Sequence, residues 1–298
     1  NVGPNVADTA YGKVKLVTAD GVNFSYYNNG AVKEISDIKG ATDKMFISIN
    51  GDIQSGNIDV RNYSTNEASE INLKGATLKA TKAVKGNDGN IWLTASNKIV
   101  AEDTTFETAN YSDEAASREG GNVRFLAGKK VSVGTSKINS VGNVDVTSQY
   151  YDVVLDKTEV AAAKDVNVKA ANIASIQNGS KVKAKNIKVK SDKDAWSSNS
   201  SLDADLITIE AGNDVVAYNV DLNNKKTVIN NSAVTAKEDV NIESEELAWT
   251  EKAEINAGKD INVKATKGSL LLNNSLMAAK NNINLSSKDS VSSFKIMV

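Results

Sequence analysis

Ala257-Gly258-Lys259-Asp260-Ile261-Asn262-Val263-Lys264-Ala265 is the stretch that decides the fold of this chain. A small residue and a polar turn precede alternating apolar and polar positions, which is typical of a β-strand with one buried face. Variants of the stretch recur at residues 163–168, 236–242 and 279–285, and a second form that starts with Gly-Asn recurs at 56–60, 89–93, 121–125 and 142–146. The chain is therefore a series of similar strands.

The spacing of these strands defines a repeat. Their first apolar residues are Val123, Val144, Val166, Ile187, Ile207, Val240, Ile261 and Ile283. They stand about 21 residues apart, except for one longer step between Ile207 and Val240. That step and the two upstream, from Ile58 to Ile91 and from Ile91 to Val123, are longer by about 12 residues. A constant period with occasional longer steps indicates a solenoid, in which insertions map to loops.

Each period holds three short apolar stretches, as at 261–263, 270–272 and 276–277. Three strands per turn predict a triangular coil, and stacked coils would pair strand on strand in parallel at about 4.8 Å. No period contains a ten-residue stretch with helical spacing, which disfavours a helical solenoid. We therefore predict an all-β fold, a parallel β-helix with about 21 residues per coil.

The composition supports this fold and narrows the function. Apolar residues make up 40% of the chain but aromatic residues only 5%, which suits stacked layers of small β-branched side chains. The 35 basic and 37 acidic residues nearly balance, so nothing favours nucleic acid as a partner. The chain has no cysteine and no histidine and lacks a calcium-loop pattern, so we expect no metal and no cofactor.

Two regions are expected. Residues 1–50 are less regular, and turn signals at Asp20-Gly21 and Asn29-Gly30 predict strands and a hairpin that act as a cap. Residues 51–298 are expected to form the rod. Insertions are predicted near 101–120, an acidic stretch, and near 216–226.

Recurring polar residues raise the question of catalysis. Asp165, Asp239 and Asp260 share one position of the repeat and would form an acidic row, as a polysaccharide-acting enzyme on a β-helix requires. Amides occupy that position in other coils, at Asn143, Asn186 and Asn282. We therefore interpret the row as side chains that cap turns through hydrogen bonds to the backbone, and we predict that the protein is not an enzyme.

Two further rows are open to two interpretations each. Asn167, Asn241, Asn262 and Asn284 recur between inward positions and either face solvent, which we favour, or stack as an amide ladder. A row of lysines either binds sulfated glycans or, more simply, discourages strand-to-strand aggregation. These lysines are Lys164, Lys185, Lys237, Lys259 and Lys280.

The repeated small-Gly-Lys-Asp-Ile-Asn-Val-x-Ala unit resembles the filamentous haemagglutinin repeat of large exoproteins that Gram-negative bacteria secrete by the two-partner pathway. Similar units occur at 127–133 and 211–215, and residues 12–25 are similar to a stretch found early in such exoproteins. The Asn-Pro-Asn motif of that family's secretion domain is absent, since Pro4 follows Gly3. The chain is then either a secretion domain without its start or a section of the rod behind it.

The resemblance implies a right-handed parallel β-helix that an outer-membrane transporter exports, secreted or displayed on the bacterial surface. It implies a non-catalytic adhesin that binds a receptor or glycan on a host or neighbouring cell. The stalk of a contact-dependent inhibition effector and a polysaccharide-acting β-helix enzyme are the alternatives. Binding residues are expected on the two insertions, namely Phe106, Tyr111, Arg118 and Tyr218.

Overall fold

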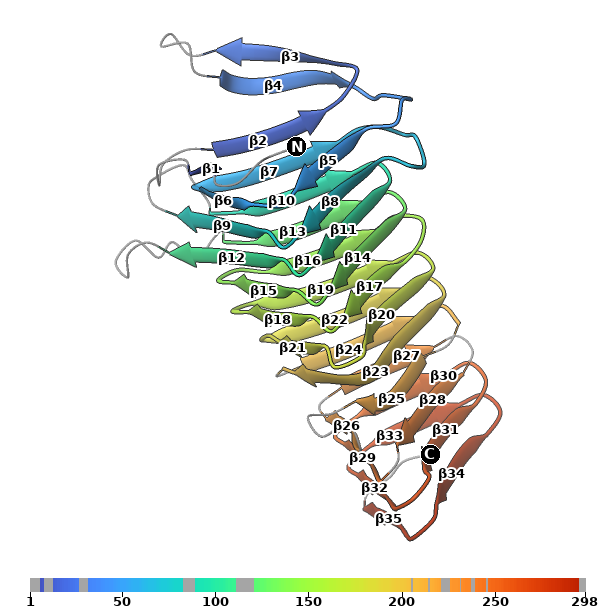
Figure 1. Ribbon diagram of the computed structural model, residues 1–298. Coiled ribbons are helices and arrows are strands. Elements are labelled where there is room, and N and C mark those ends of the chain that lie inside the picture. The colour runs from blue at the N-terminus through green and yellow to red at the C-terminus, as the bar shows by residue number, and fades with distance from the viewer. Residues whose placement is uncertain are drawn as a thin grey trace.

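The protein is an all-β parallel β-helix, seen in a computed structural model (Figure 1). The structure describes residues 6–7, 13–26, 32–82, 89–110, 121–204, 206–213, 215–220, 226–230, 232–236, 239–244 and 246–294. Within these ranges the strands stack into eleven coils, and every strand pairing except β3–β4 is parallel. Eleven coils at about 4.8 Å make a column of roughly 50 Å.

Three walls enclose the interior. Wall one consists of β2 (Lys13–Thr18), β7 (Asn57–Asn62), β10 (Ile91–Ala95), β13 (Val123–Ala127), β16 (Val144–Ser148), β19 (Asp165–Ala170), β22 (Asn186–Ser191), β24 (Leu206–Ala211), β27 (Ser232–Ala236), β30 (Glu254–Ala257) and β33 (Leu276–Ala279). Each of these strands begins one coil.

Wall two supplies the second strand of each coil. It consists of β5 (Phe46–Ile49), β8 (Glu70–Lys74), β11 (Lys98–Glu102), β14 (Lys130–Gly134), β17 (Val153–Asp156), β20 (Ile173–Gln177), β23 (Asp194–Asp203), β25 (Val215–Val220), β28 (Val240–Ser244), β31 (Ile261–Ala265) and β34 (Ile283–Ser287). Strand β23 is continuous around the next corner, because it pairs with both β20 and β21.

Wall three closes the triangle in two sections. The upper section consists of β1 (Val6–Ala7), β6 (Asp52–Ser55), β9 (Thr77–Lys82), β12 (Thr105–Asn110), β15 (Lys137–Ser140), β18 (Glu159–Ala162) and β21 (Lys181–Lys183), and it ends on β23. The lower section consists of β26 (Lys226–Asn230), β29 (Leu247–Glu251), β32 (Ser269–Asn273) and β35 (Val291–Phe294). The described strands of the two sections form separate sheets.

The strand register confirms the period predicted from the sequence. Val123 pairs with Val144, Val144 with Val166, Val166 with Ile187 and Ile187 with Ile207, so each pairing joins the first apolar residues of successive repeats. The first four of these residues alternate with outward ones and are buried, so their side chains fill the interior. Alternation and period together therefore define the coil.

One step was assigned wrongly from the sequence. Ile207 pairs in wall one with Ser232, which precedes Val240 in the chain, and not with Val240 itself. Val240 instead lies in wall two, where it pairs with Val215 and Ile261. The repeated Asp-Val/Ile-Asn signature thus moves from wall one to wall two, and most of the apparent insertion disappears.

The N-terminal region contains the expected hairpin. Strands β3 (Gly21–Tyr26) and β4 (Val32–Lys39) pair antiparallel and extend beyond the first coil (Figure 1), while the Asn29-Gly30 turn lies outside the described residues. The expected boundary at residue 50 does not coincide with a break in the sheets, because β2 pairs with β7 and β5 with β8. The first coil is thus built from this region.

The interior is a stack of aliphatic side chains with one aromatic pair. Phe106 of β12 and Phe125 of β13 are fully buried, and their ring centroids lie 4.9 Å apart with an interplanar angle of 80°. This edge-to-face arrangement is favourable for aromatic rings. It joins wall three of one coil to wall one of the next.

The corner between walls two and three uses left-handed backbone. Residues with positive φ recur there, at Gly75, Asp103, Thr135, Lys157 and Asn178. A buried hydroxyl follows in the next coils: the backbone N–H of Thr104 donates to Ser136 Oγ at 3.1 Å and that of Thr158 to Ser180 Oγ at 3.0 Å. The hydroxyls satisfy backbone groups that the sharp turn removes from the sheets.

Candidate functional site

The acidic row is a capping ladder. At the start of wall one, the backbone N–H of Asn122 donates to Asn90 Oδ1 at 2.8 Å and that of Asn143 to Asn122 Oδ1 at 2.8 Å. The ladder runs through Asn57, Asn90, Asn122, Asn143, Asp165 and Asn186. Asp260 bonds in the same way to Asp239 in wall two. Asp239 and Asp260 thus accept from a backbone N–H of the next coil, as the capping interpretation predicts, whereas Asp165 accepts from the side-chain amide of Asn186.

The ladder leads to a stability prediction. In Asn122→Ala, the Asn143 N–H loses its acceptor, so we expect a loss of about 1–2 kcal/mol in the free energy of unfolding. Asn122→Asp keeps an acceptor oxygen, as Asp165 does two coils on, and should lose less than half as much. Urea unfolding followed by circular dichroism measures both, and equal losses would contradict the ladder.

The second amide row faces outward and also forms ladder bonds. Asn167 Nδ2 donates to Asp145 Oδ1, and Asn284 Nδ2 donates to Asn262 Oδ1, each at 2.8 Å. Asn284 is exposed, and Asn167 and Asn262 are half-buried. At these positions the side chains therefore both face solvent and form ladder bonds, the two alternatives considered from the sequence.

The predicted lysine row is divided between two corners. Lys164 and Lys185 precede β19 and β22 of wall one, whereas Lys259 and Lys280 precede β31 and β34 of wall two. Lys237 lies outside the described residues. Because the signature changes walls, the lysines do not form one continuous stripe.

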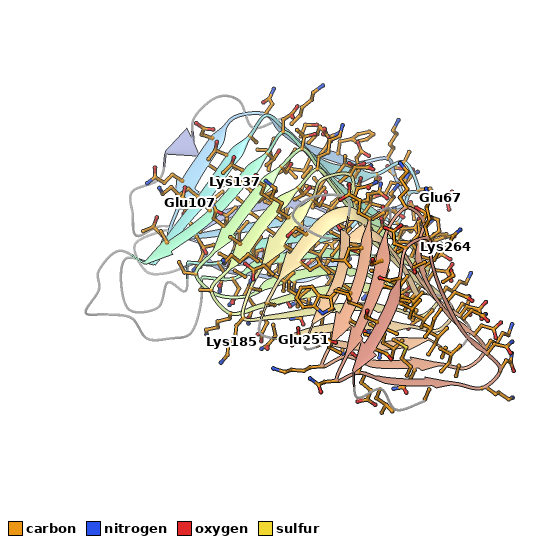
Figure 2. All side chains as sticks on the ribbon, turned by 90° about the horizontal axis from the view of Figure 1, so that it is seen from below. Glu67, Glu107, Lys137, Lys185, Glu251 and Lys264 are labelled. Atoms are coloured by element: carbon orange, nitrogen blue, oxygen red, sulfur yellow. The ribbon has the colours of Figure 1, made fainter. Side chains whose placement is uncertain are left out.

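Charged side chains surround the column. Seen from below, the labelled side chains Glu67, Glu107, Lys137 and Lys264 lie on different sides of the column (Figure 2). Glu107 pairs with Lys79 at 3.0 Å, and Lys129 pairs with Glu67, which lowers the pKa of that carboxyl below its ordinary value. These pairs are exposed and contribute little stability.

Of the four predicted binding residues, two lie on wall strands and two lie outside the described residues. Phe106 lies in β12 and is 0% exposed, so the expected exposed insertion does not begin at residue 101: residues 98–102 and 105–110 are wall strands. Tyr111 and Arg118 lie outside the described residues. Tyr218 lies in β25, which is paired on both sides, so residues 215–220 also belong to the wall.

The structure also presents aromatic side chains to solvent that the sequence analysis did not single out. Trp92 is 39% exposed on β10, Trp196 is 45% exposed on β23, and Tyr150 and Tyr151 are 69% and 51% exposed at the corner before β17. Alternation could have identified Trp92, because it stands between the inward residues Ile91 and Leu93.

Trp92 borders a pocket on the outside of wall one. The pocket has a volume of about 210 Å³ and lies across the first three coils. Its lining consists of Val14, Lys15, Asn57, Ile58, Asp59, Arg61, Asn90 and Trp92. Three strands far apart in the sequence, β2, β7 and β10, thus contribute to one site.

Arg61 is fixed within this pocket by two neighbours. Its Nε donates to Asp59 Oδ1 at 2.7 Å, its Nη2 lies 2.7 Å from Asp59 Oδ2, and its Nη1 donates to Tyr63 Oη at 3.1 Å. The hydrogen bond with Asp59 raises the pKa of Arg61 above its ordinary value, so the guanidinium remains charged. The result is a rigid, planar polar group beside an aromatic ring.

Two further kinds of site, a metal-binding cluster and a membrane-spanning helix, are absent from the part of the chain that the structure describes. Among the described residues, no cluster of three or more acidic side chains could hold a metal ion. None of the described segments forms a helix long and apolar enough to cross a membrane.

Comparison with known proteins gives a family match over part of the chain. Residues 245–293 match the haemagglutinin repeat, and this segment contains β29 to β34 and most of β35. No curated protein and no solved structure matches the chain. The match falls on the stretch whose pattern defines the repeat, and it shows that this part of the chain is similar to the haemagglutinin repeat.

Proposed function

We propose that this chain is a non-catalytic segment of a secreted or surface-displayed adhesin of the two-partner type. A partner transporter in the outer membrane exports it, and it binds a receptor or glycan on a host or neighbouring cell. The observation that carries this proposal is the haemagglutinin repeat, which forms complete coils of the β-helix. A regular column presents its side chains along a long surface, which suits display.

The polar ladder supports a non-catalytic role. Asp165 accepts a hydrogen bond from the side-chain amide of Asn186, and Asp260 accepts one from the backbone N–H of Asn282, so both carboxylates bond to the next coil. A glycosidase needs two carboxyl groups that face one substrate across about 5–9.5 Å. Such a pair is distinct from a row in which each carboxylate bonds along the axis.

The predicted contacts on the two insertions remain part of the proposal, with bounds adjusted to the strands. Residues 111–120 follow β12 and residues 221–225 follow β25. Tyr111 and Arg118 fall in the first segment, and tyrosine and arginine are enriched where proteins bind partners. Tyr218 stays a proposed contact at the edge of the second.

Attachment to cells tests the proposal. We expect purified protein to bind cultured epithelial cells or Gram-negative bacteria in a saturable manner. Replacing residues 111–119 with a Gly-Ser segment of equal length should weaken binding about tenfold, because hot-spot side chains dominate interface energies. The same replacement at 221–225 maps the second insertion, and flow cytometry with labelled protein provides the measurement.

The outcomes separate the alternatives. Saturable binding to bacteria but not to epithelial cells would favour the stalk of a contact-dependent inhibition effector. Absence of saturable binding to either cell type would contradict the adhesin. Unchanged melting temperatures in both variants confirm that the replacements leave the column intact.

A further inference from the structure

The pocket beside Trp92 has the composition of a binding site. From β2 to β22 of wall one, the outward row that contains Trp92 is otherwise polar: Lys15, Asp59, Arg124, Asp145, Asn167 and Lys188. Polar residues at these positions keep the wall soluble, and an exposed indole does not. A large aromatic surface at this place is therefore a candidate ligand platform.

The groups around the indole are suited to hydroxyl groups. Arg61 is held by the Asp59 carboxylate and the Tyr63 hydroxyl, so little further ordering is needed when its remaining N–H groups bind a ligand. Asp59 supplies acceptor oxygens next to the Arg61 guanidinium, and Asn57 also lines the pocket. An apolar face with adjoining planar donors and acceptors matches a pyranose ring, which has C–H groups on its faces and hydroxyls at its rim.

The volume and the charge of the pocket narrow the class of ligand further. The volume of about 210 Å³ lies below the roughly 300–1,000 Å³ of pockets for drug-sized ligands, so it suits a single sugar ring. Lys15 and Arg61 are positive and Asp59 is negative, which leaves one formal positive charge in the lining. Lys15 is exposed at the pocket, where it can approach an anionic substituent.

We propose that the pocket formed by Lys15, Asp59, Arg61 and Trp92 binds one acidic monosaccharide unit of a cell-surface glycan. Trp92 stacks against the ring, Arg61 and Asp59 bind its hydroxyls, and Lys15 binds its carboxylate. The cell-surface origin of the sugar rests on the proposed adhesive function. The binding itself depends only on the pocket.

A matched pair of sugars tests this assignment. The probes are methyl β-glucuronide and methyl β-glucoside, which differ in a carboxylate against a hydroxymethyl group. Saturation-transfer NMR and titration of tryptophan fluorescence on the whole chain should give a dissociation constant of about 1 mM for the glucuronide, the weak affinity expected of one sugar ring. The glucoside should bind about tenfold more weakly, because it lacks the charge that Lys15 recognises.

Two substitutions localise the site, and a third acts as the control. Trp92→Ala should abolish detectable binding, and Lys15→Gln should bring the glucuronide to the affinity of the glucoside. Trp196→Ala removes a similarly exposed indole from wall two and should leave binding unchanged. Since Trp92 points outward, its replacement should leave the melting temperature of the coils near that of the wild type.

Several results would overturn the assignment. Absence of saturation transfer at 10 mM glucuronide (about ten times its expected dissociation constant) is one, and equal loss of binding in Trp92→Ala and Trp196→Ala is another. Equal affinity for the two sugars would refute the acidic class. Glucuronide binding without cell attachment would support the pocket assignment and contradict the adhesive function. Cell attachment without sugar binding would support the adhesive function and contradict the pocket assignment.

Discussion

Replacing Phe106 with alanine is expected to lower the free energy of unfolding by about 3–5 kcal/mol, the usual cost of removing a buried phenyl ring. The side chain is fully buried and meets the edge or face of Phe125 at a centroid distance of 4.9 Å. Its neighbours along wall three are Leu78 and Ile138, which are also buried. Alanine would leave a cavity that these stacked side chains cannot close without shifting two coils.

Leucine provides the matched control at this position. Because Leu78 occupies the equivalent position one coil earlier, Phe106→Leu should cost only about 1 kcal/mol. A double-mutant cycle with Phe125→Ala should give a coupling of about 0.5–1.5 kcal/mol for the aromatic pair. Urea unfolding monitored by circular dichroism measures the four proteins of the cycle and the leucine variant. A Phe106→Ala variant with unchanged stability but reduced cell attachment would restore the surface role first expected for this residue.

The second large effect is expected at a corner between walls one and two. A Cβ atom added to Gly128 would lie 1.9 Å from the carbonyl oxygen of Ser96 in the preceding coil. That oxygen belongs to the backbone, and the Gly128 N–H already bonds across the same corner to the Ala95 oxygen at 2.9 Å. Gly128→Ala must therefore separate two coils locally, and we expect a loss of about 3 kcal/mol.

Gly134 distinguishes a backbone clash from a loss of glycine as such. Its added Cβ would lie 2.2 Å from Glu102 Oε2, the far end of a flexible side chain that can move aside. Gly134→Ala should therefore cost less than about 1 kcal/mol. Comparable losses in the two alanine variants, measured by urea unfolding, would show that corner packing does not limit the choice of residue at 128.

Some features of this site could be predicted locally, and others depended on the stacking. Alternation at Ile91-Trp92-Leu93 already places Trp92 outward, because consecutive side chains in a strand point to opposite faces. Its neighbours could not be predicted in the same way. Asp59 and Lys15 belong to the two preceding coils, far from Trp92 in the sequence, and only the register of β2, β7 and β10 brings them together.

The insertion predicted at 101–120 was placed too early in the chain, also because local sequence does not show how the strands stack. The acidic residues Glu102, Asp103 and Glu107 suggested a loop at 101–120, yet Glu102 and Glu107 lie on wall strands and Asp103 occupies the turn between them. A β-helix exposes the outward side chains of each wall strand, so charged residues there are compatible with the wall. Net charge over a window therefore does not separate a loop from a strand in this fold.

The sequence alone determined the unit of this protein: a short strand of alternating apolar residues, a polar corner and a return after about 21 residues. These are local properties, set by side-chain direction and turn chemistry. The tertiary structure decided which wall each strand occupies, because the position around the coil depends on the summed length of all preceding corners. In the tertiary structure Val240 lies in wall two and Phe106 in the interior, and three coils contribute to the Trp92 pocket.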